Sequence, residues 1–266
     1  MTNVKGNSHY SPRGYWSFAA GLALALLVMV FQLTNKAIAE DKQKSAMTIS
    51  DTNTRMGEEK KTSDSILLHG EVSGVPYYRC QVKGRNKASS EEKSLVLLHG
   101  AAFTKEDWKT SGILDDFCDR ELFGSLNVIA LDLPTKANFQ DLQNVLDAME
   151  QEQLIREKPV TLITPSAGGR TMVSWSASPT AAETIPSYIE KWIPVASNSV
   201  NNMPDSSVKL LAIVPILAIY GNQDVAGKQS SERLRQFANA QVLELTGRHP
   251  CYLDSPKDFV KEVLNF

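Results

Sequence analysis

The sequence predicts a doubly wound α/β fold with a mostly parallel sheet. Six short apolar runs follow one another between residues 94 and 247, and helix-like segments separate most of them. Runs that are apolar throughout are typical of parallel strands, because helices cover both faces of such a sheet. Strands that alternate with helices indicate that the chain winds on both sides of one sheet.

The expected strands begin with a hairpin. Residues 66–82 alternate between apolar and polar around Ser73-Gly74, a pair typical of tight turns. The six apolar runs follow at residues 94–100, 126–134, 160–165, 192–197, 215–221 and 241–247. In an open parallel sheet the functional side chains lie beyond the carboxyl ends of the strands. The polar residues that follow each run are therefore the candidates for a site.

Helices are expected between these strands. Apolar residues recur at helical spacing in residues 105–121 and 138–154, and helical segments follow at 167–175, 231–239 and 256–266. Only residues 198–214 separate the fourth run from the fifth, and 208–213 are expected to form a short helix. One helix alone takes about 11 residues on average, so we expect a minimal cap domain or none.

Composition and charge exclude several classes of protein. The chain has 266 residues, a net charge of -2, 42% hydrophobic and 22% charged residues, as in an ordinary globular protein. No basic run is longer than Lys60-Lys61, which argues against nucleic acid as a partner. The three cysteines, Cys80, Cys118 and Cys251, are too far apart for a zinc knuckle or a redox pair. An odd count argues against a disulfide framework, so three buried or idle thiols are expected.

The amino-terminal part predicts attachment to a membrane. After residues 1–14 comes an uncharged stretch, residues 15–33, whose 19 residues would span about 28 Å as a helix. It reads either as a signal-anchor of a single-pass protein or as a signal peptide cleaved near Ala39, where Ala37-Ile38-Ala39 forms an A-x-A site. In both cases the catalytic part would be lumenal, extracytosolic or secreted. Residues 34–65 are polar and predict a flexible stalk, and residues 66–266 predict the globular domain.

The stretch "TLITPSAGGRTM" places Ser166 between an apolar strand and helix-like text. Strand, turn and helix are the context of a nucleophile elbow, usually G-x-S-x-G. Here the outer positions are Thr164 and Gly168, and only Gly168 supplies the small residue that the close approach of strand and helix requires. A serine that caps the next helix is the other interpretation.

The later strand ends supply an acid and a base. Asp224 follows the run 215–221, and His249 follows the run 241–247. A serine hydroxyl is a weak nucleophile that needs an imidazole to take its proton, and the imidazole needs a carboxylate to fix its tautomer. Ser166, Asp224 and His249 appear in the order serine, acid, histidine. Asp132 and Asp254 are weaker candidates for the acid.

The stretch "HGAAF" follows the first long apolar run and predicts an oxyanion hole. In folds with a nucleophile elbow, one backbone N–H comes from this loop and another from the residue after the nucleophile. These are the amides of Ala101 and Ala167. The alternative for His99-Gly100 is a plain tight turn.

Several stretches resemble one known family. "SLVLLHGAAF", "VIALDLP", "TPSAGG", "YGNQD" and above all "GRHPCYLDSP" are similar to the alpha/beta-hydrolase domain-containing protein 14 family, over residues 66–266. The resemblance implies an alpha/beta-hydrolase fold and places the nucleophile, acid and base of the family on Ser166, Asp224 and His249. One type of member carries an amino-terminal membrane anchor. The chain departs from the family at "DLPTKANF", which lacks the usual glycines.

These observations favour a serine hydrolase that acts on a small ester or acyl substrate through an acyl-enzyme. Two alternatives stay open: a non-catalytic binding protein on the same fold, or an acyltransferase that uses the same acyl-enzyme. The sequence contains no metal or nucleotide motif, so no cofactor and no metal are expected.

Overall fold

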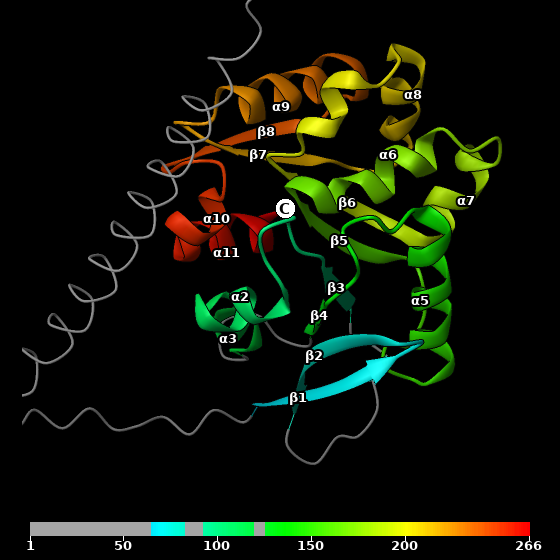
Figure 1. The fold of residues 1–266 in the computed structure, drawn as a ribbon, viewed down its shortest axis with the longest axis vertical. Coiled ribbons are helices and arrows are strands. Elements are labelled where there is room, and N and C mark those ends of the chain that lie inside the picture. The colour runs from blue at the N-terminus through cyan, green and yellow to red at the C-terminus, as the bar shows by residue number, and fades with distance from the viewer. Residues whose placement is uncertain (1–64, 83–92, 120–125) are drawn as a thin grey trace, which may run out of the picture. The chain divides into compact units, whose positions relative to one another are not determined.

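The computed structural model describes residues 65–82, 93–119 and 126–266. They belong to one compact unit, residues 61–266. An eight-stranded sheet runs through it in the order β1-β2-β4-β3-β5-β6-β7-β8 (Figure 1). The strands are β1 (Ser65–Val72), β2 (Val75–Val82), β3 (Lys93–Leu97), β4 (Leu126–Leu131), β5 (Val160–Pro165), β6 (Ile189–Val195), β7 (Leu217–Gly221) and β8 (Gln241–Leu245).

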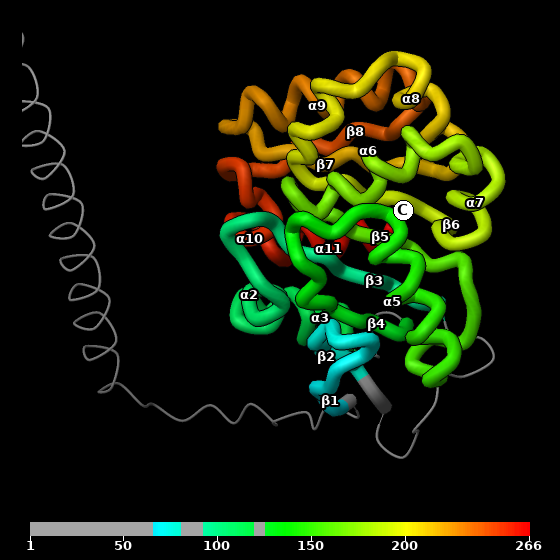
Figure 2. The backbone as a smooth tube through the Cα atoms, turned by 45° about the vertical axis from the view of Figure 1, so that its right-hand side comes forward, coloured from blue at the N-terminus to red at the C-terminus, as the bar shows by residue number. Residues whose placement is uncertain are grey.

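The sheet is parallel except at its first edge. β1 pairs with β2 and β2 pairs with β4 in the antiparallel sense, whereas all pairs from β4 to β8 are parallel. The β1–β2 hairpin therefore forms one end of the sheet, and β8 with the neighbouring α9 forms the other (Figure 2). The carboxyl ends of the parallel strands share one edge, which is where the sequence places its candidate residues.

Helices cover both faces of the sheet, as predicted. They are α2 (Lys105–Thr110), α3 (Ile113–Cys118), α5 (Phe139–Gln151), α6 (Arg170–Ser176), α7 (Ala181–Tyr188), α8 (Asp205–Leu210), α9 (Val225–Ala238), α10 (Cys251–Asp254) and α11 (Pro256–Asn265), with short 3-10 turns η1 (Ser166–Gly169), η2 (Asn198–Asn202) and η3 (Leu211–Ile213). Successive residues of β3 enter different cores: Val96 packs with α5 to α9, and Leu97 packs with α2, α3, α10 and α11. Burial of both faces explains why the strands are apolar throughout.

Two helical segments differ from the sequence prediction. The segment 105–121 forms two helices, because Gly112 adopts a left-handed conformation with φ 81° between α2 and α3. The helix α7 was not predicted, and it contains Pro186. The prediction of a minimal cap domain or none is confirmed, since residues 196–216 between β6 and β7 hold only η2, α8 and η3.

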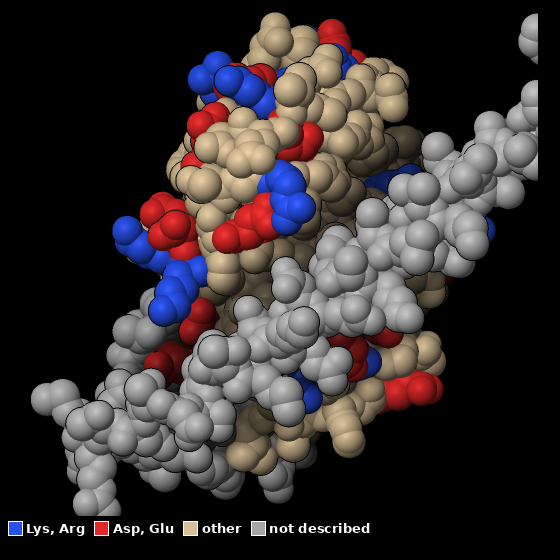
Figure 3. Space-filling model, turned by 60° about the vertical axis from the view of Figure 1, so that its left-hand side comes forward, with Lys and Arg blue, Asp and Glu red and all other residues tan. Residues whose placement is uncertain are grey.

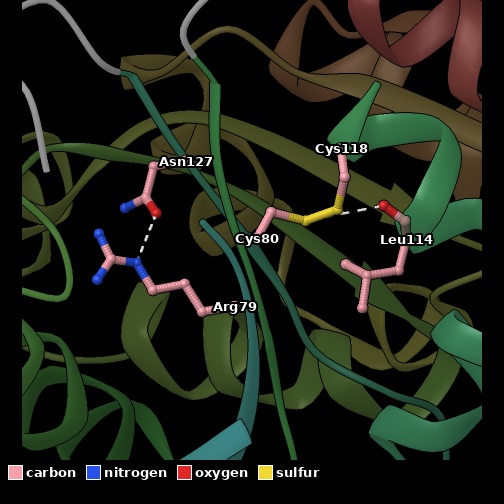
Figure 4. The surroundings of a disulfide bond; sticks show 5 residues. All are labelled: Arg79, Cys80, Leu114, Cys118 and Asn127. Carbon is pink, nitrogen blue, oxygen red and sulfur yellow. Dashed lines mark hydrogen bonds between the residues drawn. A yellow bond between two sulfur atoms is a disulfide. The ribbon is translucent and has the colours of Figure 1, made fainter. Parts of the chain in front are cut away.

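The prediction of three free thiols is wrong. Cys80 of β2 and Cys118 of α3 form a disulfide bond, with their Cα atoms 5.7 Å apart (Figure 4). The two residues are 38 positions apart in the sequence. They meet only because α3 folds back against β2, a tertiary contact that cysteine spacing does not reveal. Cys251 is free and buried, as expected.

The prediction of a membrane-spanning signal-anchor is contradicted. Within residues 65–82, 93–119 and 126–266, no helix combines the length and the apolar character needed to cross a bilayer. The longest described helix, α9, has 14 residues, whereas a span takes about 20. The single-pass, lumenal or extracytosolic localisation is therefore not supported. Residues 15–33 and the cleavage site near Ala39, on which it rests, lie outside the described residues.

Charges of both signs are mixed on the described surface. On the face shown in Figure 3, Lys and Arg side chains lie beside Asp and Glu side chains rather than in a patch of one sign. Among the described residues, Arg233 forms an ion pair with Asp205 at 2.7 Å and Arg248 forms one with Asp254 at 2.9 Å.

Candidate active site

Ser166 lies at the sharp turn between β5 and α6. Its φ is 46°, a left-handed conformation that residues other than glycine rarely adopt. The two glycines after it allow the chain to pass close to its neighbours. A Cβ at Gly168 would lie 2.9 Å from the His99 carbonyl oxygen, and a Cβ at Gly169 would lie 2.9 Å from the Ser197 Cβ. The sequence "SAGG" thus permits a turn that side chains would block.

Thr164 fits the turn although the common elbow has glycine there. Its side chain is fully buried, and its Oγ1 accepts a hydrogen bond of 2.8 Å from the Trp192 indole N–H of β6. The threonine hydroxyl therefore has a buried partner in the adjacent strand. A Cβ at Gly169 would lie 3.6 Å from Thr164 Oγ1, an ordinary contact distance, so the close approach at Gly169 is to Ser197 rather than to Thr164.

His249 joins Ser166 to Asp224. Its Nε2 lies 2.9 Å from Ser166 Oγ, and its Nδ1 lies 2.6 Å from Asp224 Oδ2. The imidazole side chain is 39% exposed and the Asp224 side chain 9% exposed. The base is therefore open to solvent, whereas the acid is shielded from it. The three residues predicted from the strand ends come together at the carboxyl edge of the sheet.

Asp224 also begins helix α9. Its Oδ1 accepts a hydrogen bond of 3.0 Å from the Gly227 N–H, as an N-cap residue does. Each carboxylate oxygen therefore has its own donor, Gly227 for Oδ1 and His249 for Oδ2. Sequence reasoning missed Gly227, because its contact with Asp224 appears only once α9 is seen to begin at this aspartate. A Cβ at Gly227 would lie 2.9 Å from Asp224 Cγ.

The two rival acids have other partners. Asp132 Oδ1 lies 3.2 Å from His99 Nε2, which joins the segment after β4 to the loop after β3. Asp254 accepts hydrogen bonds from the Arg248 backbone N–H at 2.7 Å and from its guanidinium at 2.9 Å. These bonds, the side-chain one foremost, lower the pKa of the Asp254 carboxyl. Asp254 thus fixes Arg248, the residue that precedes His249 in the loop.

Aromatic side chains pack against the segment that follows His249. Tyr252 is buried and its ring lies 4.7 Å from the Trp108 ring and 6.3 Å from the Phe103 ring, centroid to centroid. Burial raises the pKa of the Tyr252 phenol. Burial also raises the pKa of the Cys251 thiol to about 12. A thiol that stays protonated at neutral pH is a poor nucleophile, so Cys251 is no rival to Ser166.

The loop that carries the predicted oxyanion-hole residue Ala101 passes close to Ser166. A Cβ placed on Gly100, the residue before Ala101, would lie 3.6 Å from Ser166 Cβ. Ala167 follows the serine directly and is buried, while Ala101 is exposed. Across the described residues, no group of three or more His, Cys, Asp or Glu side chains is arranged to hold a metal ion.

The mostly parallel eight-stranded sheet and the serine at the turn after β5 define an alpha/beta-hydrolase fold. Solved structures agree: a hydrolase of Thermoplasma acidophilum, described as CIB-like, superposes with a TM-score of 0.56 at 18% identity, over 76% of this chain and 98% of its own. A thioesterase domain from the curacin biosynthetic pathway gives a TM-score of 0.52 at 14% identity, over 76% and 99%. At these identities the likeness concerns the fold.

Sequence relatives confirm the resemblance to the family. Human ABHD14B, by name a candidate protein-lysine deacylase, is 29% identical over 189 residues, 65% of this chain and 82% of its own. The Pongo abelii protein of the same name is 29% identical over 223 residues, 78% and 95%. Zebrafish (Danio rerio) ABHD14A is 28% identical over 181 residues, 65% and 63%. No protein-family model matches the chain. Together the relatives support a hydrolase.

Proposed function

We propose that this protein is a serine hydrolase for ester or acyl substrates, with residues 66–266 as its catalytic domain. In this proposal Ser166 is the nucleophile, His249 the general base and Asp224 the acid that orients the base. The observation that carries it is the unbroken chain of hydrogen bonds from Ser166 Oγ through both ring nitrogens of His249 to Asp224. The positive φ of Ser166 adds support, since elbows present the nucleophile in a strained turn.

In this proposal each proton of the reaction has a defined position. Because Asp224 is acceptor-only when ionised, His249 donates its Nδ1–H to it, and Nε2 is left to accept the proton of Ser166 Oγ. Oγ then bonds to the carbonyl carbon of the substrate while Nε2 takes the proton. Nε2 passes this proton to the leaving group when the tetrahedral intermediate collapses to the acyl-enzyme. Water, deprotonated by the same nitrogen, then attacks the acyl carbon; the bond from this carbon to Oγ breaks, Oγ takes the proton back from Nε2, and the carboxylic acid leaves.

The carbonyl oxygen becomes negative during attack and needs donors. The backbone amides of Ala101 and Ala167 are assigned to this oxyanion hole, because their loops meet at Ser166. Preset amide donors act only as charge develops, and each is worth about 10²- to 10³-fold in rate.

The names of similar proteins support acyl compounds as the substrate class of this protein. ABHD14B is named for removal of acyl groups from protein lysine, and the structural neighbours include a thioesterase and an esterase described for ferulic acid. All of these reactions transfer an acyl group to an enzyme nucleophile or to water. The same site could therefore serve an amide, thioester or ester.

Labelling with a fluorophosphonate probe tests the proposal. The wild-type protein should become covalently labelled at Ser166 and hydrolyse p-nitrophenyl acetate, and Ser166→Ala should lose both with an unchanged circular dichroism spectrum. His249→Ala should lose nearly as much, because nucleophile and base act as a unit. Ser187→Ala, which removes an exposed hydroxyl on α7, is the matched control and should behave as wild type. An unlabelled wild-type protein would instead favour the binding-protein alternative.

A further inference from the structure

A buried hydrogen-bond network lies beneath the nucleophile turn. The Trp192 indole N–H donates to Thr164 Oγ1 at 2.8 Å, and the Ser197 hydroxyl donates to the Thr164 carbonyl oxygen at 3.1 Å. None of the three residues is more than 2% exposed. Trp192 lies within β6 and Ser197 lies two residues past its end. Thr164 is thus tied to the neighbouring strand at two points.

The same network reaches the chain on both sides of Ser166. Thr164 precedes the serine by two residues. Ser197 also abuts Gly169, three residues after the serine, where a Cβ would lie 2.9 Å from the Ser197 Cβ. A left-handed conformation of a residue other than glycine persists only where its surroundings fix it, and Ser166 has this conformation, with φ 46°. The network supplies such surroundings.

A purely structural role is the simpler explanation and makes a different prediction. Buried polar groups need partners wherever they occur, so the loss of one partner should lower stability at any site. The structure contains a matched case: the Trp175 indole N–H donates to Thr184 Oγ1, also at 2.8 Å, between α6 and α7. Both indole side chains are fully buried, although Thr184 is only half-buried. If the two bonds only satisfy the buried indole N–H groups, breaking either should affect catalysis equally little.

We propose that Thr164, Trp192 and Ser197 are positioning residues that hold Ser166 in the conformation that keeps its Oγ within reach of His249 Nε2. The proposal rests on the proposed serine-hydrolase function and gives a role to Trp192 and Ser197, which lie outside the elbow motif, and to Thr164, which departs from it. Thr164 is the centre of the network, because it accepts from one partner with its side chain and from the other with its backbone.

The test compares kcat, KM and labelling rate for variants of the full chain. Thr164→Val keeps the shape but removes the acceptor. It should lower kcat for p-nitrophenyl acetate by about ten- to a hundredfold, since small misplacements of reacting atoms are costly in rate. The rate of fluorophosphonate labelling should fall in parallel, while KM stays within about twofold, because binding energy is not removed. Thr164→Ser keeps the hydroxyl and should restore most of the rate.

Three further variants separate positioning from stability. Trp192→Phe should lower kcat, and Thr164→Val with Trp192→Phe should cost no more than the larger single effect, because both remove one bond. Thr184→Val is the matched control and should lower the melting temperature without lowering kcat. Ser197→Ala changes little volume and should lower kcat in folded protein even if Thr164→Val does not fold.

The possible results distinguish a failure of the positioning role from a failure of the proposed function. Wild-type kcat and labelling rate in both Trp192→Phe and Ser197→Ala would overturn the proposal, as would equal losses of kcat in Thr164→Val and Thr184→Val. A wild-type protein that neither hydrolyses the ester nor is labelled would overturn the proposed function, and the positioning role would fall with it. Labelled wild type with unaffected variants would overturn the positioning role alone.

Discussion

The substitution Gly227→Ala adds one methyl group and should break the hydrogen bond between Asp224 and His249. Gly227 lies in the first turn of α9, and its N–H donates to Asp224 Oδ1 at 3.0 Å. A Cβ there would lie 2.9 Å from Asp224 Cγ and less than 2.5 Å from Oδ2, whereas ordinary contacts begin at 3.4 Å. Gly227→Ala therefore forces the carboxylate to move by about 1 Å.

The size of the effect follows from that displacement. The bond from His249 Nδ1 to Asp224 Oδ2 is 2.6 Å long, and an added 1 Å takes it to about 3.6 Å, beyond hydrogen-bond length. Misplacement on this scale costs about 10²-fold in rate, or roughly 2.7 kcal/mol of transition-state stabilisation. The upper limit is the loss of a triad acid, about 10⁴-fold. Folding should survive, since alanine is a better helix former than glycine by about 1 kcal/mol.

Steady-state hydrolysis of p-nitrophenyl acetate is the assay, repeated in an Asp224→Asn background. If the methyl group acts through the carboxylate, Gly227→Ala should cost about 10²-fold in the wild type and little once Asp224 is already asparagine. Lys228→Ala is the control, because it changes the next, exposed residue of the same helix. Full activity of Gly227→Ala, or the same loss in both backgrounds, would refute the reasoning.

Three other expectations follow from the structure. Without a cap, the rise of kcat/KM with acyl length should stop at about two to four carbons, since each CH₂ adds about 0.8 kcal/mol only when buried; a p-nitrophenyl ester series measures this, and a steady rise through eight carbons would contradict it. Cys80→Ser opens a 38-residue loop and should lower the free energy of unfolding by about 4 kcal/mol. Urea titration measures this, and the wild-type protein with its disulfide reduced should have the same free energy of unfolding as the variant. Because the pKa of Asp254 is lowered in the folded protein, its interaction with Arg248 stabilises the fold above the unfolded pKa of about 3.9, and this stabilisation is lost as the pH falls. Asp254→Asn should therefore reduce the decrease of the melting temperature at acidic pH.

The proposed site was readable from the sequence because the fold aligns strand ends. Ser166, Asp224 and His249 follow the runs that become β5, β7 and β8. Parallel strands of one sheet end at one edge, so three residues separated by up to 83 positions meet within hydrogen-bond distance. Apolar runs and chain order were enough to predict this, without any knowledge of loop conformation.

Features that depend on tertiary contacts were not readable. The Cys80–Cys118 disulfide joins strand β2 to helix α3, and neither spacing nor count of cysteines predicts it. Helix α7 was not predicted because it is short and contains Pro186, a residue that usually ends helices. The membrane prediction is not supported by the described residues, none of whose helices is long and apolar enough to cross a bilayer; residues 15–33 lie outside them.

Thr164 shows why a motif position needs its neighbour before it can be interpreted. As a sequence letter it weakens the elbow, because glycine is expected where strand and helix approach. In the structure the hydroxyl accepts the indole N–H of Trp192, a residue 28 positions later whose role no motif indicates. A glycine in its place would leave that buried donor without its partner, at a cost of about 1–3 kcal/mol. In this chain the residue types at positions 164 and 192 therefore depend on each other, because each supplies the buried partner of the other.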